Sequence, residues 1–151
     1  MRDLRLSVRI QAKPERVYRA LTRPAELGRW WHCRAEARPA NGGALRLRWR
    51  GRGAGEGRNK YPQGLGEVRG VFVDLQPGRK VAWLWEAQAP GPGTPRLVSF
   101  FILPSGRSSE VSIQHCGFEP GPGAEPLFKG FKAGWTDALS RLKRHVEGMA
   151  P

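Results

Sequence analysis

The strongest constraint on the fold is one long amphipathic segment near the end of the chain, since the other helical segments are short. Within residues 126–147, apolar side chains recur at steps of three and four, which is the spacing of one helix face. They are Phe128, Phe131, Trp135, Ala138, Leu139, Leu142 and Val146. Pro126 suits the first turn, and the basic residues 143–145 suit the negative end of the helix dipole. The pattern predicts one long helix whose apolar face needs a partner layer.

Most of the preceding chain alternates between apolar and polar side chains, which is typical of half-buried strands. The first such segment is 4–10, and the later ones are 33–38, 44–50, 66–75, 80–87, 96–103 and 109–117. Pro14 and Pro24 open two short helices between the first strand and the second. Tight turns between consecutive strands predict an antiparallel sheet, and the segregation of the helices predicts an α+β fold.

Length and composition limit the class of protein. A chain of 151 residues favours a single domain over 1–151, with enough length for a core. No apolar run approaches the roughly 18 residues of a membrane span. The N-terminus alternates charged and apolar residues and does not resemble a signal peptide. Because the two cysteines fit a reducing compartment, we expect a cytoplasmic protein with no membrane insertion.

Positive charge is concentrated in the first 60 residues, which hold 16 basic and 5 acidic side chains. One strand face and the residue after it carry Arg46, Arg48, Arg50 and Arg52. Such a row could contact phosphates, but the aromatic side chain of the same strand points to the other face, so no stacking platform accompanies it. We therefore do not expect nucleic-acid binding. The alternatives are a solvated basic face and a basic rim that attracts an anionic group of a ligand.

No metal or cofactor is expected. The pairs His32-Cys33 and His115-Cys116 contain zinc-ligand residues, but adjacent residues on a strand point to opposite faces. One site could not easily use both members of each pair. The glycine-rich segment 51–57 has a superficial likeness to a dinucleotide-binding loop. It lacks the third-glycine spacing and no helix follows it, so it is interpreted as a loop between strands.

No catalytic set stands out either, because none of the aspartates is placed beside a histidine and a nucleophile. His115 is the best single candidate, since strand alternation puts it on the inner face with Val111 and Ile113. Its ring could accept a proton or anchor a ligand. The alternative is a buried histidine satisfied by a backbone carbonyl. The sequence therefore favours a protein that is not an enzyme.

Several segments together carry a resemblance to a known family. They are residues 10–22 with Trp30-Trp31, residues 66–74, the strand with Trp83 and Trp85, residues 111–118, and Gly134-Trp135 with Leu139 and Leu142. Over about residues 3–147 the chain resembles the START/SRPBCC helix-grip superfamily, which includes the Bet v allergen-like proteins, in the branch named after the activator of the heat-shock protein 90 ATPase. The resemblance implies a curved antiparallel sheet of about seven strands that grips the long C-terminal helix around a cavity.

The resemblance also implies a range of functions. Members bind hydrophobic or amphipathic small molecules, some catalyse reactions on polyketides, and some bind proteins. We expect binding of a hydrophobic or amphipathic small molecule between the C-terminal helix and the sheet. The alternatives are a cyclase- or dehydratase-like enzyme that uses His115 as its acid–base group, and a co-chaperone-type module with a chaperone partner.

The expected ligand cavity is lined by aromatic side chains on the inner faces, with His115 as the polar anchor. The lining residues are Trp31, Trp49, Phe72, Trp83, Trp85, Phe100, His115, Phe131 and Trp135. This composition fits ligand sites, which are mostly apolar with few polar groups.

Apolar side chains also occur on the opposite face of the central strands. They are Val71, Val73, Leu84, Phe101 and Leu103. A cluster of this kind is more than scattered surface residues, and it predicts a homodimer interface on the outer face of the sheet. The alternative is a face that is locally covered.

Overall fold

One antiparallel sheet forms the scaffold of the computed structural model, which describes residues 1–49, 66–87 and 93–148. Within these ranges, seven strands are hydrogen-bonded in the order β1-β7-β6-β5-β4-β3-β2. The strands are β1 (Arg2–Ile10), β2 (Arg34–Ala37), β3 (Ala44–Arg48), β4 (Glu67–Gln76), β5 (Lys80–Trp85), β6 (Leu97–Ser105) and β7 (Ser108–Phe118). The predicted strands are thus confirmed, with ends shifted by a few residues.

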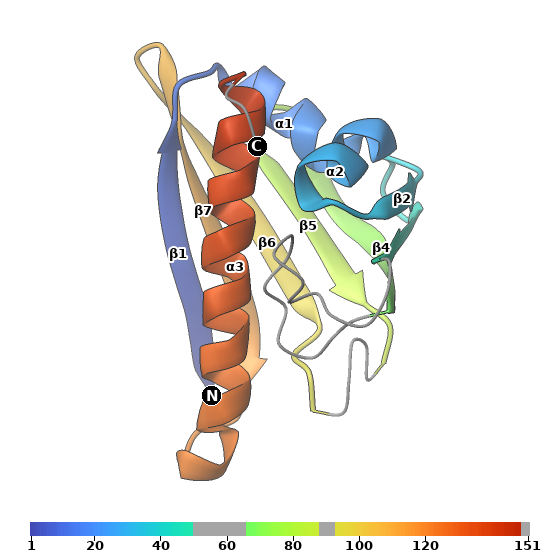
Figure 1. Ribbon diagram of the computed structural model, residues 1–151, viewed down its shortest axis with the longest axis vertical. Helices are drawn as coiled ribbons and strands as arrows, with labels where there is room; N and C mark the ends of the chain where they lie inside the picture. The colour runs from blue at the N-terminus through green and yellow to red at the C-terminus, as the bar shows by residue number, and fades with distance from the viewer. Residues whose placement is uncertain (50–65, 88–92, 149–151) are drawn as a thin grey trace.

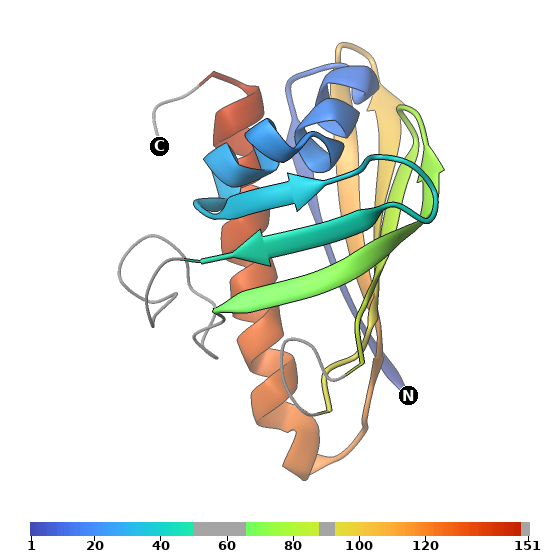
Figure 2. The ribbon, with the colours of Figure 1, turned by 90° about the vertical axis from the view of Figure 1, so that its right-hand side faces the viewer.

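The helices pack on one side of this sheet. They are α1 (Pro14–Thr22), α2 (Pro24–Trp31), the short 3₁₀ turn η1 (Pro122–Ala124) and α3 (Glu125–Val146). Figure 1 shows α3 alongside β1 and β7, with α1 and α2 together near its C-terminal end. In Figure 2, β2, β3 and β4 pass along another side of α3, so the sheet bends around the helix. This is the predicted helix-grip fold. No helix of the described residues is long and apolar enough to cross a membrane.

Two prolines set the boundaries of the short helices. Pro14 and Pro24 each occupy the first turn, where a backbone N–H is not needed. Arg23 precedes Pro24 and is extended, with φ −80° and ψ 129°, as residues before proline prefer. The chain therefore bends between α1 and α2 instead of continuing as one helix.

The end of α2 is a tight turn that brings the chain back toward β2. His32 adopts the left-handed conformation with φ 52° and ψ 50°, and the Cys33 N–H donates to the Gly28 carbonyl at 3.1 Å. This is a Schellman-type ending, in which glycine usually takes the position of His32. Gly28 is itself required, because a Cβ there would lie 2.7 Å from the Cys33 carbonyl oxygen.

The core lies between α3 and the concave face of the sheet. The apolar stripe predicted for the long helix is buried in the structure, except for Val146, which is half-buried at its end. Strand alternation places Leu4, Val98 and Val111 beneath it. The helix and sheet thus bury the two apolar faces that the sequence patterns predicted.

The convex face of the sheet carries the predicted outer cluster. Val71 and Leu84 pair across β4 and β5 and are half-buried, whereas Val73 is 43% exposed and Leu103 is 59% exposed. A register shift between Phe72 and Asp74 makes Val73 the extra residue of a β-bulge. The outer cluster, extended by one residue, consists of Val71, Val73, Leu84, Leu97, Phe101 and Leu103.

Candidate ligand-binding site

The side chains predicted to line a cavity form one buried set, which we call the aromatic layer. It consists of Trp31, Trp49, Phe72, Trp83, Trp85, Phe100, His115, Phe131 and Trp135. Trp31 is central, with ring centroids 5.4 Å from Trp49, 6.2 Å from Trp83 and 5.6 Å from Trp135. The rings meet in tilted and edge-on geometries, which aromatic pairs prefer. α2, β3, β4, β5, β6, β7 and α3 or the residues next to them all contribute to the layer.

His115 sits at one side of the aromatic layer with both ring nitrogens engaged. The Trp135 indole N–H donates to Nδ1 at 3.0 Å, and Nε2 lies 2.7 Å from the Pro95 carbonyl oxygen. An indole only donates and a carbonyl only accepts, so the proton is on Nε2. Phe118 and Phe131 pack edge-on against the ring at 4.9 and 5.0 Å. A ligand that took either nitrogen would have to replace one of these two partners.

Burial also sets the protonation state of His115. Its side chain has no exposed surface, and this desolvation lowers the pKa of the ring to about 4, against a smaller opposing effect of the Pro95 carbonyl. The ring is therefore neutral at physiological pH. A neutral histidine with fixed partners is poorly suited to take up a proton during catalysis.

Trp83 and Trp85 belong to the same layer but come from β5, two strands away from β7 in the sheet. Both side chains belong to β5 and are 0% and 3% exposed. Among the described residues, neither Nε1–H has a hydrogen-bond acceptor. Their ring centroids are 5.4 Å apart, so the two indoles that lack a described acceptor are in contact with each other. Buried donors without acceptors are rare in proteins and call for an explanation.

Gly70 makes room for the second of these rings. It lies opposite Trp85 across β4 and β5. A Cβ at this position would lie 2.8 Å from the Leu84 carbonyl oxygen and 3.2 Å from Cε3 of Trp85. The absence of a side chain therefore lets the Trp85 ring lie over the neighbouring strand, as glycines in strands often allow.

The predicted basic rim is balanced by acidic side chains in the part that the structure describes. Arg46 pairs with Glu67, which also lies 3.3 Å from Arg69, and Arg48 lies 3.6 Å from Glu36. Arg50 and Arg52 fall outside the described residues. The alternation of charges across β2, β3 and β4 leaves no continuous row of free cations there for a phosphate backbone.

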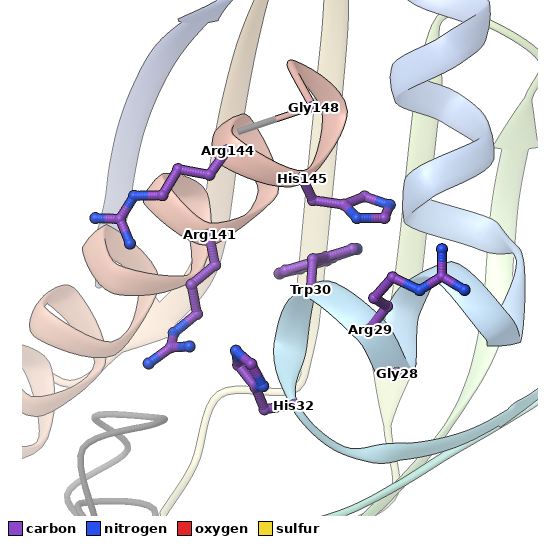
Figure 3. Close-up of a pocket in the computed structure, with 8 residues that line it drawn as sticks. All are labelled: Gly28, Arg29, Trp30, His32, Arg141, Arg144, His145 and Gly148. Carbon is purple, nitrogen blue, oxygen red and sulfur yellow. The ribbon is translucent and has the colours of Figure 1, made fainter. Parts of the chain in front are cut away.

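A pocket of about 520 Å³ lies between α2 and the last turns of α3. The lining residues of this α2–α3 pocket are Gly28, Arg29, Trp30, His32, Arg141, Arg144, His145 and Gly148. Figure 3 shows Trp30 between the two helices, with Arg141 and His32 approaching from opposite walls. Trp30 stacks on Trp31 at a centroid distance of 5.0 Å and an interplanar angle of 9°, so the pocket adjoins the aromatic layer.

Acidic side chains hold two of the pocket's basic residues in place. The Arg141 Nε donates to Asp137 at 2.7 Å, and Nε2 of His145 lies 2.9 Å from Glu26, which also binds Arg16 at 2.6 Å. Burial alone would raise the pKa of Glu26, but the bonds from His145 and Arg16 outweigh it and hold the pKa below its ordinary value. Glu26 is therefore ionised and links α1, α2 and α3.

The two histidine–cysteine pairs do not form a common site. In the described ranges, no group of three or more His, Cys, Asp or Glu side chains is placed to hold a metal ion. Burial raises the pKa of the Cys33 thiol to about 12, so this thiol is protonated and is a poor ligand.

The sequence matches a family profile over residues 11–147, which are most of the chain. The profile is described as Activator of Hsp90 ATPase homolog 1-like protein. The chain belongs to this family. No curated protein sequence matched the chain.

Several solved structures share the fold of this chain. Protein MLL2253 from Mesorhizobium loti is 20% identical with a TM-score of 0.76, over 99% of this chain and 100% of that one. The Aha1 dimer from Colwellia psychrerythraea is 20% identical with a TM-score of 0.74, over 97% of each chain. CalU16 from Micromonospora echinospora is 19% identical with a TM-score of 0.68, over 95% of this chain and 75% of that one. At these identities the likeness concerns the fold.

Sequence patterns did not reveal the α2–α3 pocket of this family member. Its basic residues stand in the last turns of two helices, where cations are expected for the helix dipole alone. Nothing in the spacing shows that these two helix ends meet. The one available signal was His32, a non-glycine residue at a position where a helix ends and the chain reverses.

Proposed function

We propose that the protein binds a planar, largely apolar small molecule that carries a carbonyl-type oxygen, at the Trp83–Trp85 side of the aromatic layer. The single observation behind this proposal is the pair of buried indole N–H groups that lack acceptors within the described residues. The surrounding rings supply an apolar contact surface of the kind that ligand sites use. The function is binding, and no chemical step is proposed.

The energetics of the two indoles favour an acceptor from outside the chain. A buried donor that has lost its water costs about 1–3 kcal/mol when it finds no partner. Within the part of the chain that the structure describes, neighbouring Trp83 and Trp85 have no acceptor, whereas the indole N–H groups of Trp30, Trp49 and Trp135 donate to protein atoms. A ligand oxygen between the two rings would recover part of that cost on binding. An apolar molecule of the same shape without the oxygen would not.

The polar anchor is therefore placed at Trp83 and Trp85 in this proposal. His115 was the candidate from the sequence. Both of its nitrogens have protein partners, however, and its lowered pKa keeps it neutral. The same two facts give no support to the alternative of an enzyme with His115 as its acid–base group.

A matched pair of probes tests the proposal. 2-Acetylnaphthalene carries a ketone oxygen, and 2-ethylnaphthalene has nearly the same shape without it. We expect the ketone to bind more tightly, by about tenfold, and to shift the indole N–H signals of Trp83 and Trp85 in proton–nitrogen NMR spectra. Trp83→Phe and Trp85→Phe assign these signals and each reduce the preference for the ketone.

Two results would overturn the assignment. Equal affinity for ketone and hydrocarbon would show that no donor is used. Ketone binding that shifts only the Trp30 or Trp135 signals would place the ligand elsewhere. Trp49→Phe serves as the matched control, because the Trp49 N–H already donates to the Trp31 carbonyl at 3.1 Å.

We also propose that the outer cluster forms a homodimer interface. Val73, Leu97 and Leu103 are its exposed members, and a structural relative is described as a dimer. Burial of these side chains against a second copy would remove their apolar surface from water. A chaperone partner and a cytoplasmic location stay predictions of the sequence.

A further inference from the structure

The α2–α3 pocket is lined by cations without lining carboxylates. Its charged side chains are Arg29, Arg141, Arg144 and, when protonated, His32 and His145. Arg29 and Arg144 are both exposed, and Figure 3 shows Arg29 beside Trp30 on α2 and Arg144 extending from α3 away from Trp30. Neither has an ion-pair partner among the residues described. The volume of about 520 Å³ falls within the range of small-molecule sites.

Helix dipoles account for only part of this charge. Both helices end at the pocket, and each C-terminus acts like about half a negative charge. Asp137 and Glu26 add two more. The arginines in or against the pocket are Arg16, Arg29, Arg141 and Arg144. Their summed positive charge exceeds the negative charge of the two helix ends and the two carboxylates by about one unit. One bound anion would balance this excess.

Arg141 is the residue best placed to bind that anion. Its side chain is only 13% exposed, and Asp137 takes the Nε donor at 2.7 Å. The terminal guanidinium nitrogens have no partner among the described residues. A guanidinium held by one edge in this way presents its other donors as a planar fork, which matches a carboxylate in bidentate geometry.

The remaining wall is aromatic and fixed. The Trp30 Nε1–H donates to the Ala20 carbonyl at 2.8 Å, and the Trp30 ring stacks on Trp31. These two contacts fix the orientation of the Trp30 ring. His32 reaches the pocket from a left-handed backbone position with φ 52°. Such conformations in non-glycine residues are costly and cluster at ligand sites. An occupant that suits these walls has a flat apolar body.

We propose that the α2–α3 pocket binds a small aromatic carboxylic acid as its carboxylate. Arg141 anchors the carboxylate, Arg29 and Arg144 attract it, and Trp30 contacts the aromatic body. This site is distinct from the interior site of the proposed function, and it goes beyond that function.

Titration with 2-naphthoate, beside its neutral analogue 2-naphthamide, tests the pocket. We expect 2-naphthoate to shift the Trp30 indole signal and the backbone signals of Gly28 and Gly148, and to bind at least tenfold more tightly than the amide. Arg141→Lys keeps the charge but loses the fork, and it should weaken 2-naphthoate about tenfold. Arg29→Ala and Arg144→Ala should each weaken it several-fold and reduce the dependence on salt.

The controls separate this site from other effects. Lys129→Ala removes one charge from α3 about 22 Å from Arg144, given 1.5 Å per helical residue, and should leave binding unchanged. Because Arg141→Lys could disturb the Asp137 contact, Arg29→Ala and Arg144→Ala on the surface provide an independent check. Equal affinity for acid and amide would overturn the proposal. So would 2-naphthoate binding that survives all three arginine variants, or that shifts Trp83 and Trp85 instead of Trp30.

Discussion

At the β7 side of the aromatic layer, Trp135 donates its indole N–H to His115, which in turn donates to the Pro95 carbonyl. At the β5 side, the indoles of Trp83 and Trp85 are buried to the same extent and donate to no described acceptor. Both regions carry buried tryptophans on the concave face of the sheet. The pairing of their polar atoms differs.

This difference separates a structural region from a candidate binding region. Where every donor has an acceptor, the rings have one arrangement and little reason to accept a ligand. Where donors are unpaired, the protein alone bears a cost that a suitable molecule can remove. The following variants test the contrast, in order of decreasing effect on the free energy of unfolding.

Truncation of Trp135, which is hydrogen-bonded to His115, should cause the largest loss in the free energy of unfolding. Trp135→Ala removes a fully buried ring and leaves Nδ1 of His115 without its donor, so we expect a loss of about 3–5 kcal/mol in the free energy of unfolding. Trp135→Phe keeps most of the packing and should cost less. Denaturant titration measures both. An unchanged midpoint for Trp135→Ala would show that this helix face is not the buried one.

The pH dependence of stability should report the neutral state of His115. Its pKa is lowered to about 4 in the folded protein, so the unfolded chain binds a proton near pH 6.5 that the native state does not. Stability should therefore fall by about 2 kcal/mol from about pH 7 to about pH 5. That range lies above the titration of most carboxyl groups. His115→Gln should have a flatter profile over it, and equal slopes for the two proteins would contradict the assignment.

Trp30 and Trp85 provide a matched comparison, because each is 3% exposed. The Trp30 N–H donates to the Ala20 carbonyl, whereas that of Trp85 has no described acceptor. Replacement by Phe removes the same atoms in both cases. We expect Trp30→Phe to cost about 1 kcal/mol more than Trp85→Phe, the contribution of one hydrogen bond. A larger loss for Trp85→Phe in thermal unfolding would show that its N–H is satisfied.

Substitutions in the outer cluster should weaken dimerisation and hardly change the free energy of unfolding. Leu103 is 59% exposed, so Leu103→Lys should change the free energy of unfolding by less than about 0.5 kcal/mol. The same change places a charge in the proposed dimer interface and should shift the mass measured by light scattering from dimer to monomer. Lys132→Ala on the exposed side of α3 is the control. A wild-type protein that is monomeric at high concentration would remove the dimer proposal.

Patterns along the sequence predicted an α+β fold, and the resemblance to the START/SRPBCC superfamily implied the helix-grip arrangement. The two-residue period of β1 and the helical period of α3 each identify an apolar face, and prolines locate α1 and α2. These signals are local, and the need to bury both apolar faces predicts that the sheet packs against the long helix. The same periodicity placed His115 and the tryptophans of β5 on the inner side, where the structure has them.

The sequence patterns did not predict the hydrogen bonds of the buried side chains or the α2–α3 pocket. Alternation shows that Trp83 and Trp135 are both inward, but not that only Trp135 meets an acceptor. Likewise, Arg141 and His32 are far apart in the chain and share one pocket only because α2 packs against the end of α3. Hydrogen-bond partners and shared pockets depend on tertiary contacts, and the spacing of residues along one sequence does not reveal these contacts.

The pairing of β1 with β7 has a consequence for synthesis on the ribosome. β1 lies at one edge of the sheet and pairs with β7 alone among the described strands. Lys143 of α3 also donates to the carbonyl of Arg9, 134 positions earlier in the chain. Within this sheet, β1 is synthesised first, and its backbone groups find their partners only after β7 has followed. We expect such a chain to complete its fold late, since closing long loops is slow and precedes the gain from the contacts they bring.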